Sequence, residues 1–176
     1  ADICTQNGVM VFSDEIHFDF TYPGHPHTVF ATLEGEAARQ CIVGTSASKS
    51  FNLAGLATAN IIIPEEEVRR RFQEKAAGYT GSYTGYFGLA ATRAAYERAE
   101  GWLDELLVHL QGNWDFCRDA LAQIFPSAKV YPMEGTYLLW ADFRSLGLAP
   151  EEQSRFMREE ALLWLDEGCM FGSAGN

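Results

Sequence analysis

The chain has 176 residues, of which 47% are hydrophobic and 21% charged, with a formal net charge of −11. This composition is typical of a globular protein with a sizeable core, and it excludes a disordered chain. The negative charge argues against nucleic acid as a partner, because phosphate binding requires a basic face. No apolar run approaches the roughly 20 residues of a membrane helix and no stretch resembles a signal peptide, so we expect no membrane partner.

The first elements are the end of a helix and an apolar strand. Residues 1–8 are typical of a final helical segment that ends on Gly8, and Val9–Ser13 is typical of a strand buried on both faces of a parallel sheet. Asp14 follows this strand, at the end where open α/β sheets bind their ligands. It is a candidate for chemistry or, equally, a solvated turn carboxylate or helix cap.

A loop around Phe18–Pro26, rich in aromatic residues, proline and glycine, carries His25 and His27. Their spacing would suit a metal, but the sequence shows no third ligand. Surface-loop histidines are therefore the favoured interpretation.

The next strands enclose an isolated lysine. After a short helix at 33–38, Arg39–Gly44 and Ala59–Ile63 read as apolar strands, and Lys49 between them is one of three lysines in the chain. Burying an unpaired ammonium costs on the order of several kcal/mol, so a lysine between two buried strands points to a function. A solvated charge at a strand exit is the common alternative. The hydroxyls of Ser46 and Ser48 shift the balance toward a site.

Helices dominate the middle of the chain. Glutamates after Pro64 predict a helix start, because carboxylates suit the first turn. Gly78–Tyr86 is either a ligand-facing loop or a flexible connection. Apolar residues from Leu89 to Leu110 recur at helical spacing and predict one long amphipathic helix, which the pattern of Trp114–Phe125 continues.

From Lys129 the sequence pattern changes to α+β, which places a domain boundary within roughly residues 112–128. Beyond it we expect two strands, a helix and a short final strand, at Val130–Pro132, Thr136–Asp142, Pro150–Glu160 and Leu162–Leu165. We therefore predict a mainly parallel α/β portion at 1–115 and a smaller α+β portion at 116–176. Both ends look interrupted, which predicts a fragment of a longer chain.

The cysteines indicate the compartment. Cys4, Cys41, Cys117 and Cys169 are widely spaced and follow no metal-ligand or redox pattern. Reduced, mostly buried thiols in a cytoplasmic protein are therefore expected.

Three features stand together in this part of the chain: an acid at one strand end, a lysine after the next strand, and hydroxyls before the lysine. A pyridoxal phosphate enzyme needs this set. A lysine can form a Schiff base and move a proton, an aspartate can keep a pyridine nitrogen protonated, and hydroxyls can hold a phosphate.

The sequence resembles the fold-type I pyridoxal phosphate enzymes of the aspartate aminotransferase superfamily, and within it the cystathionine β-lyase (C–S lyase) branch of class I/II aminotransferases. The matching motifs occur in order, at Ser13–His17, Ser48–Leu56, Ala95–Leu103, Glu134–Trp140 and Gly168–Gly175. The resemblance implies the later half of the large domain, including the long connecting helix, followed by a truncated small domain.

The resemblance also implies roles for individual residues. Lys49 would be the Schiff-base lysine, and Asp14 would partner the pyridine nitrogen. His17 would bond the phenolic oxygen where most aminotransferases have a tyrosine. Ser46 and Ser48 would contact the phosphate, Ser46 being the better candidate. A cysteine conjugate would be the substrate and a homodimer the parent assembly.

Departures from the family pattern separate the possible functions. Asn52 follows the lyase branch, and Ala57 stands where many aminotransferases carry a phosphate-binding arginine. We therefore favour β-elimination to pyruvate, ammonia and a thiol over transamination. A non-catalytic regulatory or interaction module is the alternative of another class, although no basic patch supports it. Because relatives draw several site residues from an N-terminal half, we expect this chain alone to bind the cofactor weakly and to be nearly inactive.

Overall fold

The computed structural model describes residues 1–79, 85–172 and 175. The chain divides into two compact units, one made of residues 1–112 with 133–138 and the other of 113–132 with 139–176. The domain division that we predict, between residues 115 and 116, stays a prediction.

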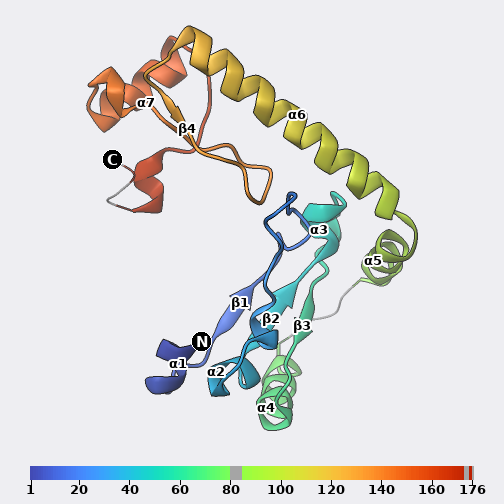
Figure 1. Cartoon of the computed structure of the whole chain (residues 1–176). Helices are drawn as coiled ribbons and strands as arrows, with labels where there is room; N and C mark the ends of the chain where they lie inside the picture. The colour runs from blue at the N-terminus through green and yellow to red at the C-terminus, as the bar shows by residue number, and fades with distance from the viewer. Residues whose placement is uncertain (80–84, 173–174, 176) are drawn as a thin grey trace. The chain divides into compact units, whose positions relative to one another are not determined.

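Three short strands form the sheet of the first unit (Figure 1). In spatial order they are β1 (Phe12–Asp14), β2 (Ile42–Thr45) and β3 (Asn60–Ile62). β2 runs parallel to β1, with Asp14 opposite Gly44, and antiparallel to β3, with Val43 opposite Ile62. The sheet expected to be mainly parallel is thus mixed within the described residues. Its one parallel pair brings the ends of β1 and β2 to the same edge.

The core of this unit lies around β2 and the short helix α3 (Ala47–Ser50) that follows it. Cys41, Val43 and Ala47 are each at most 1% exposed. Gly44 permits close approach of the Phe12 ring, because a Cβ there would lie 3.1 Å from Phe12 Cζ. Apolar burial therefore fixes the chain immediately before Lys49.

β1 differs from its prediction in length and burial. We expected a strand at Val9–Ser13, buried on both faces, but pairing covers Phe12–Asp14. Val9 and Met10 are each 52% exposed, and Phe12 is 59% exposed. Within the described residues β1 pairs with β2 alone, so one of its edges is unpaired. The predicted burial of this strand is wrong for this chain.

Short helices and turns surround the sheet. They are α1 (Asp2–Gln6), η1 (Phe30–Thr32), α2 (Glu36–Arg39), η2 (Ala54–Leu56) and α4 (Glu66–Ala76). Gly8 takes φ +61° after α1, which confirms the predicted helix end, since glycine adopts this conformation without steric cost. α4 begins later than expected: Glu65 caps it by accepting the Val68 N–H at 2.7 Å, and Pro64 precedes the cap.

The predicted long helix is in fact two. α5 (Tyr86–Arg98) and α6 (Glu100–Ile124) meet at Ala99, whose φ of −114° interrupts the helical geometry. Gly101 lies just beyond the break, but a single glycine within a helical pattern does not by itself predict a helix end, and the apolar periodicity continues across it. The continuation of the helix beyond Trp114 is confirmed. Within the Gly78–Tyr86 segment, residues 80–84 lie outside the described residues.

The second unit contains a short antiparallel ladder and one helix. Its elements are β4 (Lys129–Val130), β5 (Ala141–Asp142), η3 (Arg144–Leu146), α7 (Pro150–Glu159) and η4 (Gly168–Phe171). α7 confirms the predicted helix. The two predicted strands before it shrink to two residues each, and residues 133–138 belong to the first unit. Leu162–Leu165 is not a strand: Leu162 takes φ +54°, which extended pairing cannot accommodate.

The cysteines are less buried than expected. All four are free thiols, but Cys41 alone is buried, whereas Cys4 and Cys117 are half-buried and Cys169 is exposed. Burial raises the pKa of the Cys41 thiol. None of the described helices combines the length and the apolar character needed to cross a membrane.

Candidate active site

Lys49 lies on α3, directly after the buried strand β2. Ser46 begins this short helix, because its Oγ accepts the Ser48 N–H at 3.0 Å and donates to the Thr58 carbonyl at 2.6 Å. The start of α3 is thus tied to the segment that leads into β3. The position of Lys49 is set by bonds within the protein.

Lys49 is not buried, contrary to the expectation for a lysine between two buried strands. Its side chain is exposed, so its ammonium is solvated and needs no buried partner. What distinguishes it is the contrast with its surroundings, since every other residue of Cys41–Ser50 is buried or half-buried. A tightly packed stretch presents one amine to solvent.

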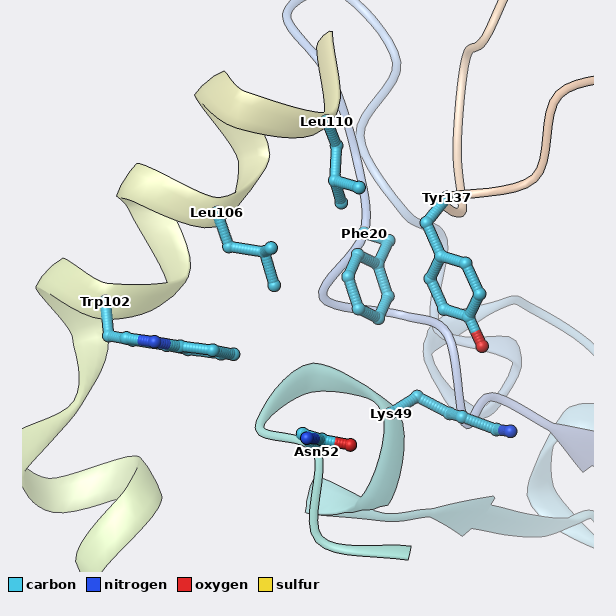
Figure 2. A pocket seen from close by; sticks show the side chains of 7 residues that line it. All are labelled: Phe20, Lys49, Asn52, Trp102, Leu106, Leu110 and Tyr137. Atoms are coloured by element: carbon cyan, nitrogen blue, oxygen red, sulfur yellow. The ribbon is translucent and has the colours of Figure 1, made fainter. Parts of the chain in front are cut away.

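A pocket of about 300 Å³ lies next to Lys49 (Figure 2). Apart from Lys49 its walls are one amide and five apolar or aromatic side chains, namely Asn52, Phe20, Trp102, Leu106, Leu110 and Tyr137. The aliphatic stem of Lys49 forms part of the wall, and its amine points away from Trp102 (Figure 2). All of these residues belong to the first unit.

Asp14 is the last residue of β1. It lies at the same edge of the sheet as the end of β2, where the chain continues into Ser46 and α3. It faces Gly44 across the parallel pair, two residues before Ser46. Its side chain is exposed, and Oδ1 accepts the Ile16 N–H at 3.2 Å. The structure therefore brings Asp14, Ser46 and Lys49 to one edge, but no hydrogen bond or ion pair joins Asp14 to Lys49 within the described residues.

His17 carries a buried polar atom without a partner. Nδ1 of its ring is buried and makes no hydrogen bond within the described residues. Such an atom costs roughly 1–3 kcal/mol, which a ligand can recover by bonding to it. The ring centroid of Tyr137 lies 5.4 Å from that of His17, and the Phe20 centroid lies at 6.1 Å.

Ser46 and Ser48 differ in their hydrogen bonds and in their exposure. The Ser46 hydroxyl has a single proton, which it donates to the Thr58 carbonyl, and its oxygen lies 2.7 Å from Ser48 Oγ. Ser46 is also 3% exposed, whereas Ser48 is half-buried. Ser48 is therefore the more accessible of the two hydroxyls, and the choice between Ser46 and Ser48 as phosphate contact stays a prediction.

Sequence reasoning did not identify Glu15, the carboxylate next to Asp14. Glu15 is 5% exposed, and it accepts hydrogen bonds from the Phe30 N–H at 2.9 Å and from Ser13 Oγ at 3.0 Å. Its Oε2 lies 2.9 Å from His27 Nε2. Burial raises the pKa of Glu15, but these hydrogen bonds outweigh it and the net pKa is lowered. Glu15 thus fastens the loop behind Asp14.

The sequence also gave no signal for Asp19. Its Oδ2 accepts the Ser50 hydroxyl at 2.5 Å, and the Tyr96 hydroxyl lies at 3.4 Å. Ser50 is fully buried and follows Lys49 directly, so Asp19 ties the aromatic loop to α3. Burial, together with the charge of Asp19, raises the pKa of Tyr96 to about 12.

The loop histidines pair with carboxylates. His27 contacts Glu15, and His25 Nδ1 lies 3.6 Å from Glu134. In the described part of the chain no group of three or more His, Cys, Asp or Glu residues could hold a metal. Both histidines are exposed, which confirms them as residues of a surface loop, and His27 reaches from there to the buried Glu15.

The chain is similar to several known proteins over almost its whole length. The cystathionine β-lyase PatB of Bacillus subtilis is 33% identical over 99% of this chain and 45% of its own length. The structure of cystalysin from Treponema denticola, which contains pyridoxal 5′-phosphate, matches with a TM-score of 0.93 and 36% identity over 99% of this chain and 44% of that one. The aspartate aminotransferase of Geobacillus stearothermophilus is 25% identical over 99% of this chain and 45% of its own length.

The chain therefore spans about 45% of the curated relatives that it matches. The family model for class I and II aminotransferases matches residues 1–173, almost the whole sequence. The chain belongs to the aminotransferase class I and II family.

Proposed function

We propose that this chain is part of a pyridoxal phosphate-dependent C–S β-lyase, which splits a cysteine conjugate into pyruvate, ammonia and a thiol. The observation that carries the proposal is the solvent-exposed Lys49, which a closely packed stretch presents beside a pocket at the carboxyl edge of the sheet. The similarity to PatB and to cystalysin supports the proposal.

The residues present fit this cofactor. Lys49 has an accessible amine, and the unpartnered Nδ1 of His17 calls for a hydrogen-bonding ligand. Asp14 offers an exposed carboxylate and Ser48 a hydroxyl that can turn toward a phosphate. An amine, a carboxylate, an imidazole and a hydroxyl are the groups that an aldehyde, a pyridine nitrogen, a phenolic oxygen and a phosphate require.

When bound, pyridoxal phosphate supplies an electron sink for the negative charge that forms at the substrate Cα. Lys49 Nζ would hold the cofactor at its aldehyde carbon, and as a free amine it would accept the proton from the substrate Cα. Asp14 would hold a proton at the pyridine nitrogen, and His17 would bond the phenolic oxygen. Ser48 and Ser46 would orient the phosphate. Departure of the thiolate from Cβ would complete the elimination, and addition of water to the remaining enamine would give pyruvate and ammonia.

Transamination is the second candidate, because it shares the loss of the Cα proton. The similarity to an aspartate aminotransferase favours it, although at lower identity than the similarity to the lyase PatB. Asn52, which follows the lyase branch, lines the pocket beside Lys49. Ala57 stands where many aminotransferases carry a phosphate-binding arginine. Both residues favour elimination. A non-catalytic module stays the alternative of another class, but an accessible lysine at a pocket argues against it.

We also propose a homodimer for the parent protein and the domain division at residue 115. Large apolar side chains are exposed in both units, as Met10 and Trp164 illustrate at 52% and 86%. Burying such side chains against another subunit or another part of the parent protein would be favourable. The four free thiols support a reducing, cytoplasmic environment.

The test is attachment followed by product analysis. The full chain is incubated with pyridoxal phosphate, reduced with borohydride and digested, and the labelled peptide is identified by mass spectrometry. We expect the label on Lys49. Incubation with L-cystathionine should then give pyruvate and a thiol in equal amounts, slowly.

Each candidate predicts a different outcome. Accumulation of pyridoxamine phosphate with a keto acid would contradict the proposed lyase and support an aminotransferase. Label spread evenly over all three lysines would contradict the site itself. Rapid, sustained pyruvate formation would contradict the weak activity expected of this chain.

A further inference from the structure

The turn Gly135–Tyr137 is fastened to the aromatic loop Phe20–Tyr22 by a β-bridge, with its backbone hydrogen bond, and by one side-chain hydrogen bond. Gly135 forms a β-bridge with Thr21, the Thr136 N–H donates to the Phe20 carbonyl at 3.0 Å, and the Tyr22 hydroxyl donates to the Thr136 carbonyl at 2.9 Å. The approach is close, because a Cβ on Gly135 would lie 3.3 Å from the Phe20 carbonyl. Two segments distant in sequence are thus locked together.

Thr136 at the centre of this turn has a strained backbone. Its φ is +61°, in the left-handed region that β-branched residues rarely occupy. Strain of this kind persists only where the surrounding structure imposes it, and it clusters at functional sites. Here the contacts from Phe20 and Tyr22 impose it. The consequence is the direction of the next side chain, Tyr137.

Tyr137 packs against the residue that we assign to the cofactor. Its ring meets Phe20 edge-on, with centroids 5.0 Å apart, and lies 5.4 Å from the His17 ring. Figure 2 shows the Tyr137 ring beside Phe20, at the side of the pocket toward which the Lys49 amine points. No hydrogen bond orients His17 within the described residues, so the orientation of its imidazole depends on these rings.

We propose that Tyr137 is a positioning residue of the site. Its ring, aimed by the strained Thr136 turn, holds the His17 imidazole in the orientation needed to bond a ligand. That the ligand is the phenolic oxygen of pyridoxal phosphate rests on the proposed function. The ring performs this role, and the hydroxyl of Tyr137 is not required for it.

The test separates the ring from the hydroxyl. Tyr137→Leu removes the ring, whereas Tyr137→Phe keeps both ring contacts and deletes the hydroxyl. Tyr131→Leu is the matched control, since Tyr131 is a half-buried tyrosine of the second unit that stacks with Lys129. Tyr22→Phe is a milder variant, because it removes only the hydroxyl that holds the Thr136 carbonyl.

Two measurements are made on the full chain. The first follows the His17 ring resonances by NMR over a pH titration without cofactor, assigned with His17→Gln. The second is the dissociation constant of pyridoxal phosphate. Tyr137→Leu should move the His17 resonances and titration midpoint and weaken cofactor binding by about three- to tenfold, the range expected for loss of an aromatic contact.

Tyr137→Phe and Tyr131→Leu should match the wild type in both measurements, and Tyr22→Phe should shift His17 in the same direction as Tyr137→Leu, by less. A folded Tyr137→Leu with unchanged His17 resonances and cofactor affinity would overturn the proposal, as would a Tyr137→Phe that shifts as far as Tyr137→Leu. A wild type that binds no cofactor would overturn the proposed function, while the His17 titration would still decide the role of Tyr137.

Discussion

The stretch Cys41–Ser50 and the helix α6 are opposites in packing. In the first, six of ten residues are buried, and Lys49 is the exposed one. In α6, with 25 residues, none is buried, and Val108 and Phe116 are 75% and 73% exposed. The first stretch takes its conformation from tertiary contacts and the second from helical propensity and one partly covered face.

The contrast shows why the candidate site is where it is. A reacting amine has to be held in place while remaining accessible, and dense packing beneath an exposed side chain achieves both. The pocket combines the two regions, because Lys49 comes from the packed stretch while Trp102 and Leu106 come from α6. Substitutions should therefore have very unequal effects in the two places.

The largest difference is expected between lysines. Lys49→Ala should abolish the reducible attachment of pyridoxal phosphate, whereas Lys75→Ala, on the exposed last turn of α4, should leave it intact. Absorbance of the bound cofactor and borohydride labelling measure this. Equal loss in both variants would show that the packed stretch presents no special amine.

The same valine-to-alanine change should differ between the regions. Val43 is 1% exposed, so Val43→Ala should lower the free energy of unfolding by about 2 kcal/mol through lost burial and a residual cavity. Val108 is 75% exposed, so Val108→Ala should stay within about 0.5 kcal/mol. Urea unfolding at a fixed pH measures both. A large effect at Val108 would show that α6 buries more than the described contacts indicate.

Glycines should respond with opposite signs. A Cβ on Gly88 of α5 would lie 3.0 Å from the Leu56 carbonyl oxygen and closer still to Thr58 Oγ1, so Gly88→Ala should destabilise by about 1–3 kcal/mol. Gly112 of α6 has open space, so Gly112→Ala should stabilise by about 0.5–1 kcal/mol, as alanine favours the helix. Thermal unfolding of the two variants provides the measurement. If both variants changed the stability in the same direction, the difference in packing between the two glycines would be contradicted.

The smallest effect concerns two Glu–His pairs. The pKa of Glu15 is lowered in the folded chain, so its contribution to stability is present above the unfolded pKa, near 4.5, and is lost as pH falls through the lower folded pKa. Glu15→Gln should cost on the order of 1 kcal/mol at pH 7 and flatten the stability profile below pH 4.5.

Glu134→Gln is the matched control for this pair. Glu134 is 63% exposed and its His25 partner lies 3.6 Å away, so the change should stay within about 0.5 kcal/mol at either pH. The measurement is the urea midpoint between pH 3 and pH 7. If the urea midpoint of Glu15→Gln fell at low pH as steeply as that of the wild type, protonation of Glu15 would not be the cause of the loss of stability in acid.

Local patterns predicted most elements but not their limits. The apolar run before Gly44 forms β2, Gly8 ends α1, and α7 begins at Pro150 as predicted. The break at Ala99 was not predicted, because helical patterns tolerate a single glycine such as Gly101 and the apolar spacing continues across it. The region after Leu162 was mistaken for a strand, since four apolar residues in a row satisfy a strand pattern whether or not a partner strand exists.

The sequence indicates which residues are candidates for the site, but it does not indicate their contacts. Asp14 and Lys49 stand out from residue type and position, and parallel pairing of β1 with β2 places them at one edge as expected. The bond from Ser46 to the Thr58 carbonyl could not be foreseen, because it depends on how the chain folds back after α3. Glu134–Trp140 carried the family resemblance, yet only the fold showed Tyr137 against His17.

The sequence by itself determined the family and the chemistry available to it, because both depend on which side chains occur and in what order. The tertiary structure alone decided that Lys49 is exposed, that Glu15 is buried, and that a strained threonine aims Tyr137 at His17. The physical reason is that burial and orientation depend on contacts between segments distant in sequence, such as Phe20 with Thr136, and no local pattern encodes those contacts.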